Sequence, residues 1–255
     1  MKITDVGKGS KPRIAVVGCL HGNERLGIDV IGGLGDSPTS SCQLRLIVAN
    51  EEAMALGKRF VDSDLNRSFP GNRSGGAHEE RLAHALIAAL NGCGFAIDVH
   101  STTADTEPFA IATRLDKGTL RMLRAACVSK AVLMGPAVAG GKSLIDHANG
   151  ISLEFNEATH AAEAERIVRN TIEGIASGAD NEKRLFYASG ILKAPIGFMP
   201  AAISSFSHVS AGDVLGYAGS RPIKSEQAFF PVLFGEKEYN GTICIMAREM
   251  PWPVL

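Results

Sequence analysis

Short apolar runs alternate with amphipathic stretches between residues 13 and 176 of the chain. Continuous apolar runs are typical of strands buried on both faces of a sheet, and leucines spaced four residues apart indicate a helix. Because the two kinds of segment alternate, we expect an α/β fold with helices covering the sheet. The predicted strands span residues 13–18, 44–49, 95–99, 109–113, 131–134 and 151–155, and the predicted helices span 24–34, 79–90, 117–128 and 161–176.

The pattern changes after a polar stretch at residues 179–183. Beyond it, short apolar runs are separated by glycines and prolines, as in small antiparallel β structures. We therefore predict two domains, an α/β domain over residues 1–183 and a small all-β domain over residues 184–255.

Composition and charge exclude several classes of partner. The chain is 45% hydrophobic and 21% charged, with a formal net charge of −1, so no overall field attracts nucleic acid or an anionic membrane. No apolar run approaches the roughly 20 residues that span a bilayer, and the first residues lack the apolar stretch of a signal peptide. The five cysteines are scattered and odd in number, which favours reduced thiols in a cytoplasmic protein. A homo-oligomer is compatible with this composition.

Polar side chains lie at or just past the ends of three of the predicted strands. His21 and Glu24 come after the first strand, His100 follows the strand at 95–99, and Glu154 closes the strand at 151–155. Because ligands gather at the carboxyl ends of strands in open α/β sheets, we expect these side chains to meet at one edge. Two imidazoles and one carboxylate leave a fourth position open, as catalytic zinc requires.

Glu154 interrupts an apolar strand, where a carboxylate must be paired, protonated or functional. Next to a metal site it is suited to act as a general base. The alternative is a strand-end glutamate that faces solvent. Asp98, two residues before His100 on the same strand face, is one candidate for orienting an imidazole, and a backbone carbonyl is the other.

A polar loop carries Asn66 and Arg67, an amide and a guanidinium that together can bind a carboxylate, with Arg59 as a second cation. The alternative is a solvated basic loop. Residues 135–143 resemble a phosphate-binding loop, but the spacing is one residue too long and includes Pro136, so we assign them no such role.

Four motifs, taken in their order along the chain, resemble those of the aspartoacylase and succinylglutamate desuccinylase family, a branch of the zinc carboxypeptidase clan. They are His-Gly-Asn-Glu at 21–24, Asp-Leu-Asn-Arg at 64–67, Asp-Val-His-Ser-Thr at 98–102 and the strand-borne Glu154. The resemblance runs from about Arg13 to Tyr239. It implies a mixed sheet flanked by helices, a small C-terminal β domain that narrows the cleft, and one Zn²⁺ per chain bound by His21, Glu24 and His100.

The resemblance also implies roles for the remaining candidates. Glu154 would be the catalytic base, Arg59 would stabilise the oxyanion, and Asn66 and Arg67 would hold the substrate carboxylate. Tyr239 aligns with a tyrosine that reaches the site from the C-terminal domain. The family's arginine for an acidic substrate side chain is missing here. Lys142 is the nearest cation, so it is the candidate in that place.

We therefore predict a zinc-dependent amidohydrolase that removes the acyl group from a small N-acyl amino acid, with Glu154 deprotonating the attacking water. One alternative is a zinc carboxypeptidase that acts on peptides with the same site. The other is a non-catalytic module that binds a metal or ligand on the same fold.

Overall fold

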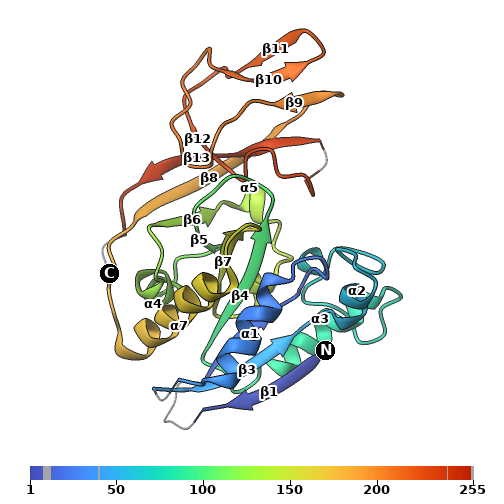
Figure 1. The fold of residues 1–255 in the computed structure, drawn as a ribbon, viewed down its shortest axis with the longest axis vertical. Helices are drawn as coiled ribbons and strands as arrows, with labels where there is room; N and C mark the ends of the chain where they lie inside the picture. Colours follow the sequence, from blue (N-terminus) through green and yellow to red (C-terminus); the bar gives the residue numbers. More distant parts are fainter. Residues whose placement is uncertain (8–12, 40, 240, 254–255) are drawn as a thin grey trace.

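A computed structural model describes residues 1–7, 13–39, 41–239 and 241–253 of the chain. A ten-stranded sheet runs through the molecule and carries helices on both faces (Figure 1). In spatial order its strands are β1 (Lys2–Val6), β3 (Gln43–Val48), β2 (Arg13–Gly18), β4 (Phe95–Thr102), β7 (Gly150–Asn156), β5 (Phe109–Ala112), β6 (Lys130–Met134), β8 (Arg184–Lys193), β13 (Thr242–Met250) and β12 (Phe230–Val232).

The sheet is mixed. Strands β3, β2, β4 and β7 are parallel, whereas β5 runs antiparallel to β7 and parallel to β6. The parallel strands place their carboxyl ends at one edge, where His100 of β4 pairs directly with Glu154 of β7. Together with the helices and the small C-terminal sheet, this arrangement confirms the predicted fold class.

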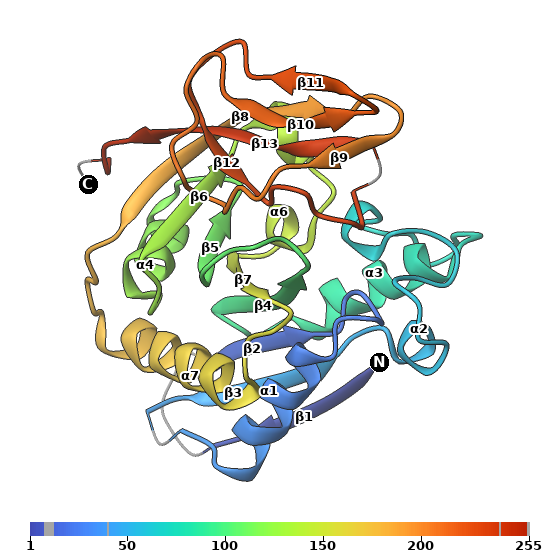
Figure 2. The same ribbon diagram turned by 45° about the horizontal axis from the view of Figure 1, so that its top comes forward.

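Helices cover the two faces of the large sheet (Figure 2). The long helices α1 (Leu26–Asp36), α4 (Lys117–Ala125) and α7 (Ala161–Ser177) pack together on one face, over the odd-numbered apolar residues of β4 and β7. The other face carries α3 (His78–Ala89), α5 (Pro136–Ala139) and α6 (Leu144–His147), with α2 (Glu51–Ala55) and the short 3-10 helix η1 (Leu65–Arg67) beside them. Because side chains alternate along a strand, Asp98, His100, Ser152 and Glu154 all point to this second face.

Some elements differ from the pattern-based prediction. Strand β1 is an edge strand with mostly exposed side chains, so it lacks the apolar run that marks a buried strand. Helix α1 continues through Gly32, Gly33 and Gly35, because Val30 and Leu34 are fully buried and packing outweighs the low helix propensity of glycine. Residues 135–143 form the helix α5 and the turn before α6.

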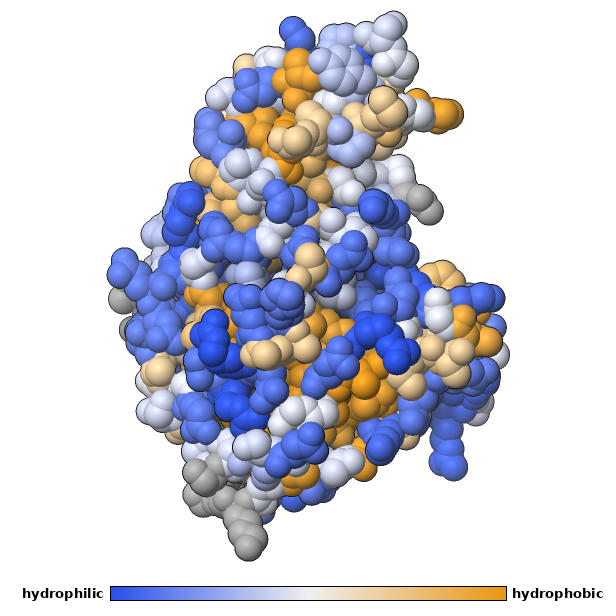
Figure 3. Space-filling view, in the orientation of Figure 1, coloured by the Kyte–Doolittle hydropathy of each residue, from blue (hydrophilic) through white to orange (hydrophobic). Residues whose placement is uncertain are grey.

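The C-terminal segment divides between two sheets. Strands β8, β13 and β12 extend the large sheet, and β9 (Phe198–Pro200), β10 (Val214–Ala218) and β11 (Arg221–Lys224) form a separate antiparallel sheet. The division into domains at residues 183 and 184 stays a prediction. Figure 3 shows apolar side chains near the small sheet, a region that includes the exposed Ile196 and Met199. Within the described ranges no helix combines the length and apolar character needed to cross a membrane.

Candidate active site

The structure brings His21, Glu24 and His100 together in a buried cluster. One ligand atom from each lies within 4.8 Å of the others, and the three residues are only 3, 7 and 5% exposed, respectively. His21 Nδ1 is 2.6 Å from Glu24 Oε1, and His100 Nδ1 is 3.0 Å from Glu24 Oε2. Two imidazole nitrogens therefore converge on one carboxylate.

The far nitrogen of each ring meets a second carboxylate. His21 Nε2 lies 3.1 Å from Asp64 Oδ1, and His100 Nε2 lies 2.7 Å from Asp98 Oδ2. When Nδ1 holds a metal ion, the ring proton sits on Nε2, where the carboxylate of Asp64 or Asp98 can accept it. This arrangement orients a metal-binding histidine. The sequence identified Asp98 as a candidate for it but missed Asp64.

The surroundings of the cluster favour a positive charge. Burial opposes protonation of His100, yet the Asp98 and Glu24 carboxylates raise the pKa of the ring well above its ordinary value. His21 Nδ1 and Glu24 Oε1, which are 2.6 Å apart, can share a proton or bind the same metal ion. Nitrogen and carboxylate donors with this orientation fit zinc.

A close backbone approach shapes the turn between His21 and Glu24. Gly22 packs against α2, and a Cβ at this position would lie 2.2 Å from the carbonyl carbon of Ala53. Its N–H donates to the Arg59 carbonyl at 3.0 Å. Only glycine allows this contact, and the turn therefore ties the cluster to the loop that begins at Arg59.

That loop is organised by Glu79, a residue that sequence reasoning missed. The carboxylate of Glu79 is fully buried and accepts hydrogen bonds from the N–H groups of Val61, Asp62 and Ser63 at 2.7 to 3.1 Å. Asn50 Nδ2 donates a fourth bond at 3.1 Å. These contacts hold the backbone between Arg59 and Asp64.

Arg59 lies against the cluster and is half-buried. Its Nη2 donates to Asp64 Oδ2 at 3.2 Å and also lies 3.0 Å from His21 Nε2, and its Nη1 donates to Glu24 Oε1 at 3.3 Å. The guanidinium carbon is 6.0 Å from the centre of the Tyr239 ring. The structure therefore places Arg59 and Tyr239, both predicted from the sequence, beside the cluster.

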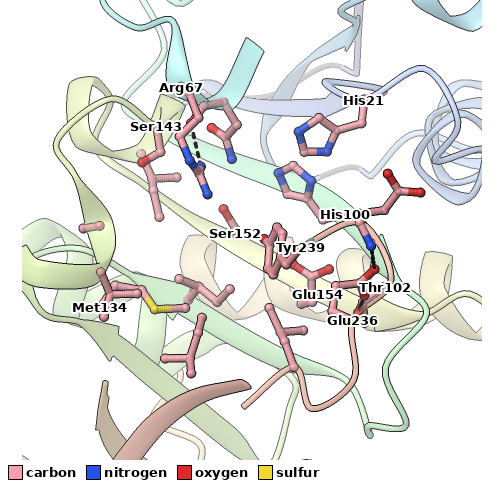
Figure 4. Close-up of a pocket in the computed structure, with 18 of the residues that line it drawn as sticks. His21, Arg67, His100, Thr102, Met134, Ser143, Ser152, Glu154, Glu236 and Tyr239 are labelled. Carbon is pink, nitrogen blue, oxygen red and sulfur yellow. Dashed lines mark hydrogen bonds between the residues drawn. The ribbon is translucent and has the colours of Figure 1, made fainter. Parts of the chain in front are cut away.

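Glu154 faces the same space from the neighbouring strand. It lines a cavity of about 370 Å³ together with the three residues of the cluster (Figure 4). Burial raises the pKa of Glu154 to about 8, and the nearby Glu24 and Glu236 carboxylates add to the effect although His100 opposes it. A carboxylate with this pKa can both accept and release a proton near neutral pH.

Asn66 and Arg67 also line the cavity, from η1. Asn66 Oδ1 accepts a hydrogen bond from Leu144 N at 2.9 Å, so η1 is fixed to the start of α6. Arg67 is exposed and Nη1 donates to the Asn66 carbonyl at 2.8 Å. Lys142, by contrast, is exposed and does not belong to the cavity lining, so the structure does not bring it to the site.

The C-terminal segment closes the cavity through Glu236, a second residue that the sequence did not reveal. Its carboxylate accepts from Thr103 N at 2.8 Å and from Thr103 Oγ1 at 3.0 Å, and also from the Thr102 hydroxyl. These bonds fasten the segment carrying Tyr239 to the end of β4, and Tyr239 lines the cavity.

Several known proteins resemble this chain in sequence or in fold. Residues 10–178 match the family described as succinylglutamate desuccinylase/aspartoacylase catalytic domain. A probable aspartoacylase of Acaryochloris marina is 31% identical over an alignment of 109 residues, and the match covers 36% of this chain and 36% of that protein. The rat N-acyl-aromatic-L-amino acid amidohydrolase (carboxylate-forming) is 32% identical over an alignment of 110 residues, and the match covers 37% of this chain and 34% of that protein. The matched stretch thus spans about a third of these curated relatives.

Two solved structures share the fold over most of their length. Murine aminoacylase 3 has a TM-score of 0.82 at 19% identity, covering 94% of this chain and 97% of that one. A succinylglutamatedesuccinylase/aspartoacylase from Rhodobacter sphaeroides has a TM-score of 0.76 at 18% identity, covering 97% of this chain and 89% of that one.

Proposed function

Because this chain belongs to the succinylglutamate desuccinylase/aspartoacylase family, we propose that it hydrolyses the amide bond of a small N-acyl amino acid and uses one zinc ion bound by His21, Glu24 and His100. The observation that carries the proposal is the convergence of both Nδ1 atoms on the Glu24 carboxylate, with Glu154 in the same cavity.

The chain's own groups divide the remaining work. Zinc bound at the cluster would supply Lewis-acid activation of a water molecule and of the amide carbonyl. Glu154 accepts the proton of the attacking water and returns it to the departing amine, a task suited to its raised pKa of about 8. Arg59 stabilises the negative charge that develops on the carbonyl oxygen.

The substrate is held at the other end of the cavity. Arg67 and the Asn66 carboxamide bind the carboxylate of the amino acid, which places the amide bond between them and the cluster. Tyr239 contributes a wall beside Arg59. We expect this activity in the cytoplasm, since all five cysteines are free.

The test is to measure the zinc content and the release of amine from N-acyl amino acids in the same preparation. We expect about one zinc per chain with turnover. Glu154→Ala should retain zinc and lose turnover, and His100→Ala should lose both. Glu157→Ala is the matched control, because Glu157 is exposed and lies three residues away.

Two results would contradict the proposal. Full turnover in Glu154→Ala would exclude this residue as the base. Bound zinc without amine release from N-acyl amino acids would favour a peptidase if peptides are cleaved, and a non-catalytic module if they are not.

A further inference from the structure

The cavity continues past the zinc-binding cluster into a lobe lined by apolar side chains. We define the apolar lobe by six residues: Ile111, Met134, Val138, Ile145, Leu233 and Ile245. All except Val138 are buried, so their packing fixes the shape of the lobe. In Figure 4, Met134 lies on the opposite side of the cavity from His21.

The order of strands separates charged from apolar groups. His100 lies on β4 and Glu154 on β7, and the next strand, β5, pairs Ile111 with Ser152 of β7. Farther along the sheet, β6 ends at Met134 and β13 carries Ile245. The cavity wall is therefore formed by ionisable side chains at β4 and β7 and by apolar side chains at β5, β6 and β13.

Among the residues that the structure describes, no cation in the cavity lining is free for an acidic substrate side chain. Arg59 is bonded to Glu24 and Asp64, and Arg67 is assigned to the carboxylate common to all amino acids. Lys142 lies outside the lining. A carboxylate in the apolar lobe would lose its hydration without gaining a partner, which is costly.

Two of the hydroxyl groups that line the cavity, those of Ser143 and Ser152, have partners in the protein. Ser143 Oγ donates to Asp146 Oδ2 at 2.7 Å, in the capping box of α6. Ser152 Oγ donates to Asp98 Oδ2 at 3.4 Å. These hydroxyls consequently serve the protein rather than a polar substrate group.

The lobe adjoins the carboxylate-binding end of the cavity. Asn66 accepts a hydrogen bond from Leu144 N in α6, and the next residue of that helix, Ile145, lines the lobe. Figure 4 places Arg67 and Ser143 on the same side as Met134, while Thr102 and Glu236 lie on the far side of Glu154. The group attached to the α-carbon, next to the bound carboxylate, therefore reaches the lobe, and the acyl group lies toward Glu236.

We propose that the substrate is an N-acyl derivative of an amino acid with a large, uncharged, apolar side chain, which occupies the apolar lobe. The inference rests on the proposed function and assigns its substrate class. Each methylene group buried in the lobe should raise kcat/KM about fourfold, so the kcat/KM of the leucine substrate should exceed that of the alanine substrate by about 10- to 100-fold.

The test compares N-acetyl-L-leucine, N-acetyl-L-phenylalanine, N-acetyl-L-alanine, N-acetyl-L-aspartate and N-succinyl-L-glutamate with the zinc-loaded enzyme. We expect leucine and phenylalanine to be preferred, with the two acidic substrates at least about tenfold below alanine. Val138→Arg would place a cation at the lobe, so it should lower kcat/KM for the leucine substrate at least about tenfold and raise it for the aspartate substrate. Val138→Leu is the matched control and should keep the wild-type order.

The outcomes separate this inference from the function on which it rests. Preference of the wild-type enzyme for either acidic substrate would overturn the apolar specificity while confirming amide hydrolysis. Equal kcat/KM for the leucine, phenylalanine and alanine substrates would also overturn it, because the lobe would then not hold the amino acid side chain. Zinc-loaded enzyme that releases no amine from any member of the panel would overturn the proposed function itself.

Discussion

Glu79 offers the sharpest test of how the site is held together, because it touches no substrate and none of the three proposed metal ligands. The residue is 0% exposed, and its two carboxylate oxygens accept three backbone bonds and one side-chain bond. Glu79→Ala leaves those donors without a partner in a buried space. Glu79→Gln keeps one oxygen acceptor but turns an amide group toward the remaining N–H donors.

The expected losses follow from these bonds. A hydrogen bond to a charged group contributes about 1.5 to 3 kcal/mol, but such contributions are not additive within one network. We expect Glu79→Ala to lower the free energy of unfolding by about 3 to 5 kcal/mol and Glu79→Gln by about 1 to 3 kcal/mol. Because Glu79 holds the segment between Arg59 and Asp64, both variants should also lose turnover.

The effect should depend on pH in a defined direction. Burial opposes ionisation of Glu79, but the backbone donors hold its pKa below the ordinary value. The folded-state pKa is thus lower than the unfolded-state value of about 4.3, so the stabilisation is complete above that pH and disappears as the pH falls through the folded-state pKa. The difference between wild type and Glu79→Gln should be largest above about pH 5 and shrink below about pH 4.

Urea denaturation followed by circular dichroism measures the free energies, at pH 7 and again in acid. Glu157→Gln is the control, since substitution of this exposed glutamate should lower the free energy of unfolding by less than about 0.5 kcal/mol. If Glu79→Ala costs less than about 1 kcal/mol and keeps full turnover, then the loop does not depend on this carboxylate and the argument fails.

Three other predictions concern the same architecture. Gly22→Ala should lower the free energy of unfolding by about 2 kcal/mol or more, because the added Cβ would meet the α2 backbone. Gly32→Ala, on the open face of α1, should raise it by about 0.5 to 1 kcal/mol. Thermal denaturation compares the two variants. Asp64→Asn should weaken zinc binding by about 10- to 100-fold in a competition titration against a chelator, and unchanged affinity would contradict its role in orienting His21. Glu236→Gln should lower kcat/KM while the zinc content stays near that of wild type, and loss of zinc would mean that the residue supports the cluster instead.

The parts of the site that the sequence predicted share a local signal. His21, His100 and Glu154 each interrupt or follow an apolar run, and the parallel pairing of β2, β4 and β7 brings such positions to one edge. The sequence predicted that these residues lie at one edge of the sheet, but it could not predict the register that pairs His100 with Glu154. Strand β1 was missed because an exposed edge strand needs no apolar run.

The residues missed at the site act through partners that the sequence pattern does not reveal. Glu79 binds backbone groups 16 to 18 positions away, and a backbone N–H has no residue identity to recognise. In the sequence Glu79 and Glu80 begin a predicted helix, where acidic residues are common because they complement the helix dipole. That ordinary explanation conceals the second role of the Glu79 carboxylate.

Glu236 shows why the cavity requires the C-terminal segment as well as the parallel strands. Its bonds to Thr102 and Thr103 cross 133 or more positions of sequence and attach that segment to the strand that carries His100. The same segment supplies Leu233 and Ile245 to the apolar lobe and Tyr239 to the wall beside Arg59. The cluster for the metal can therefore be assembled by β2, β4 and the loops beside them, whereas the surfaces that select the substrate depend on contacts made by the last quarter of the chain. Substitutions in this segment should accordingly change the choice of substrate before they change the metal content.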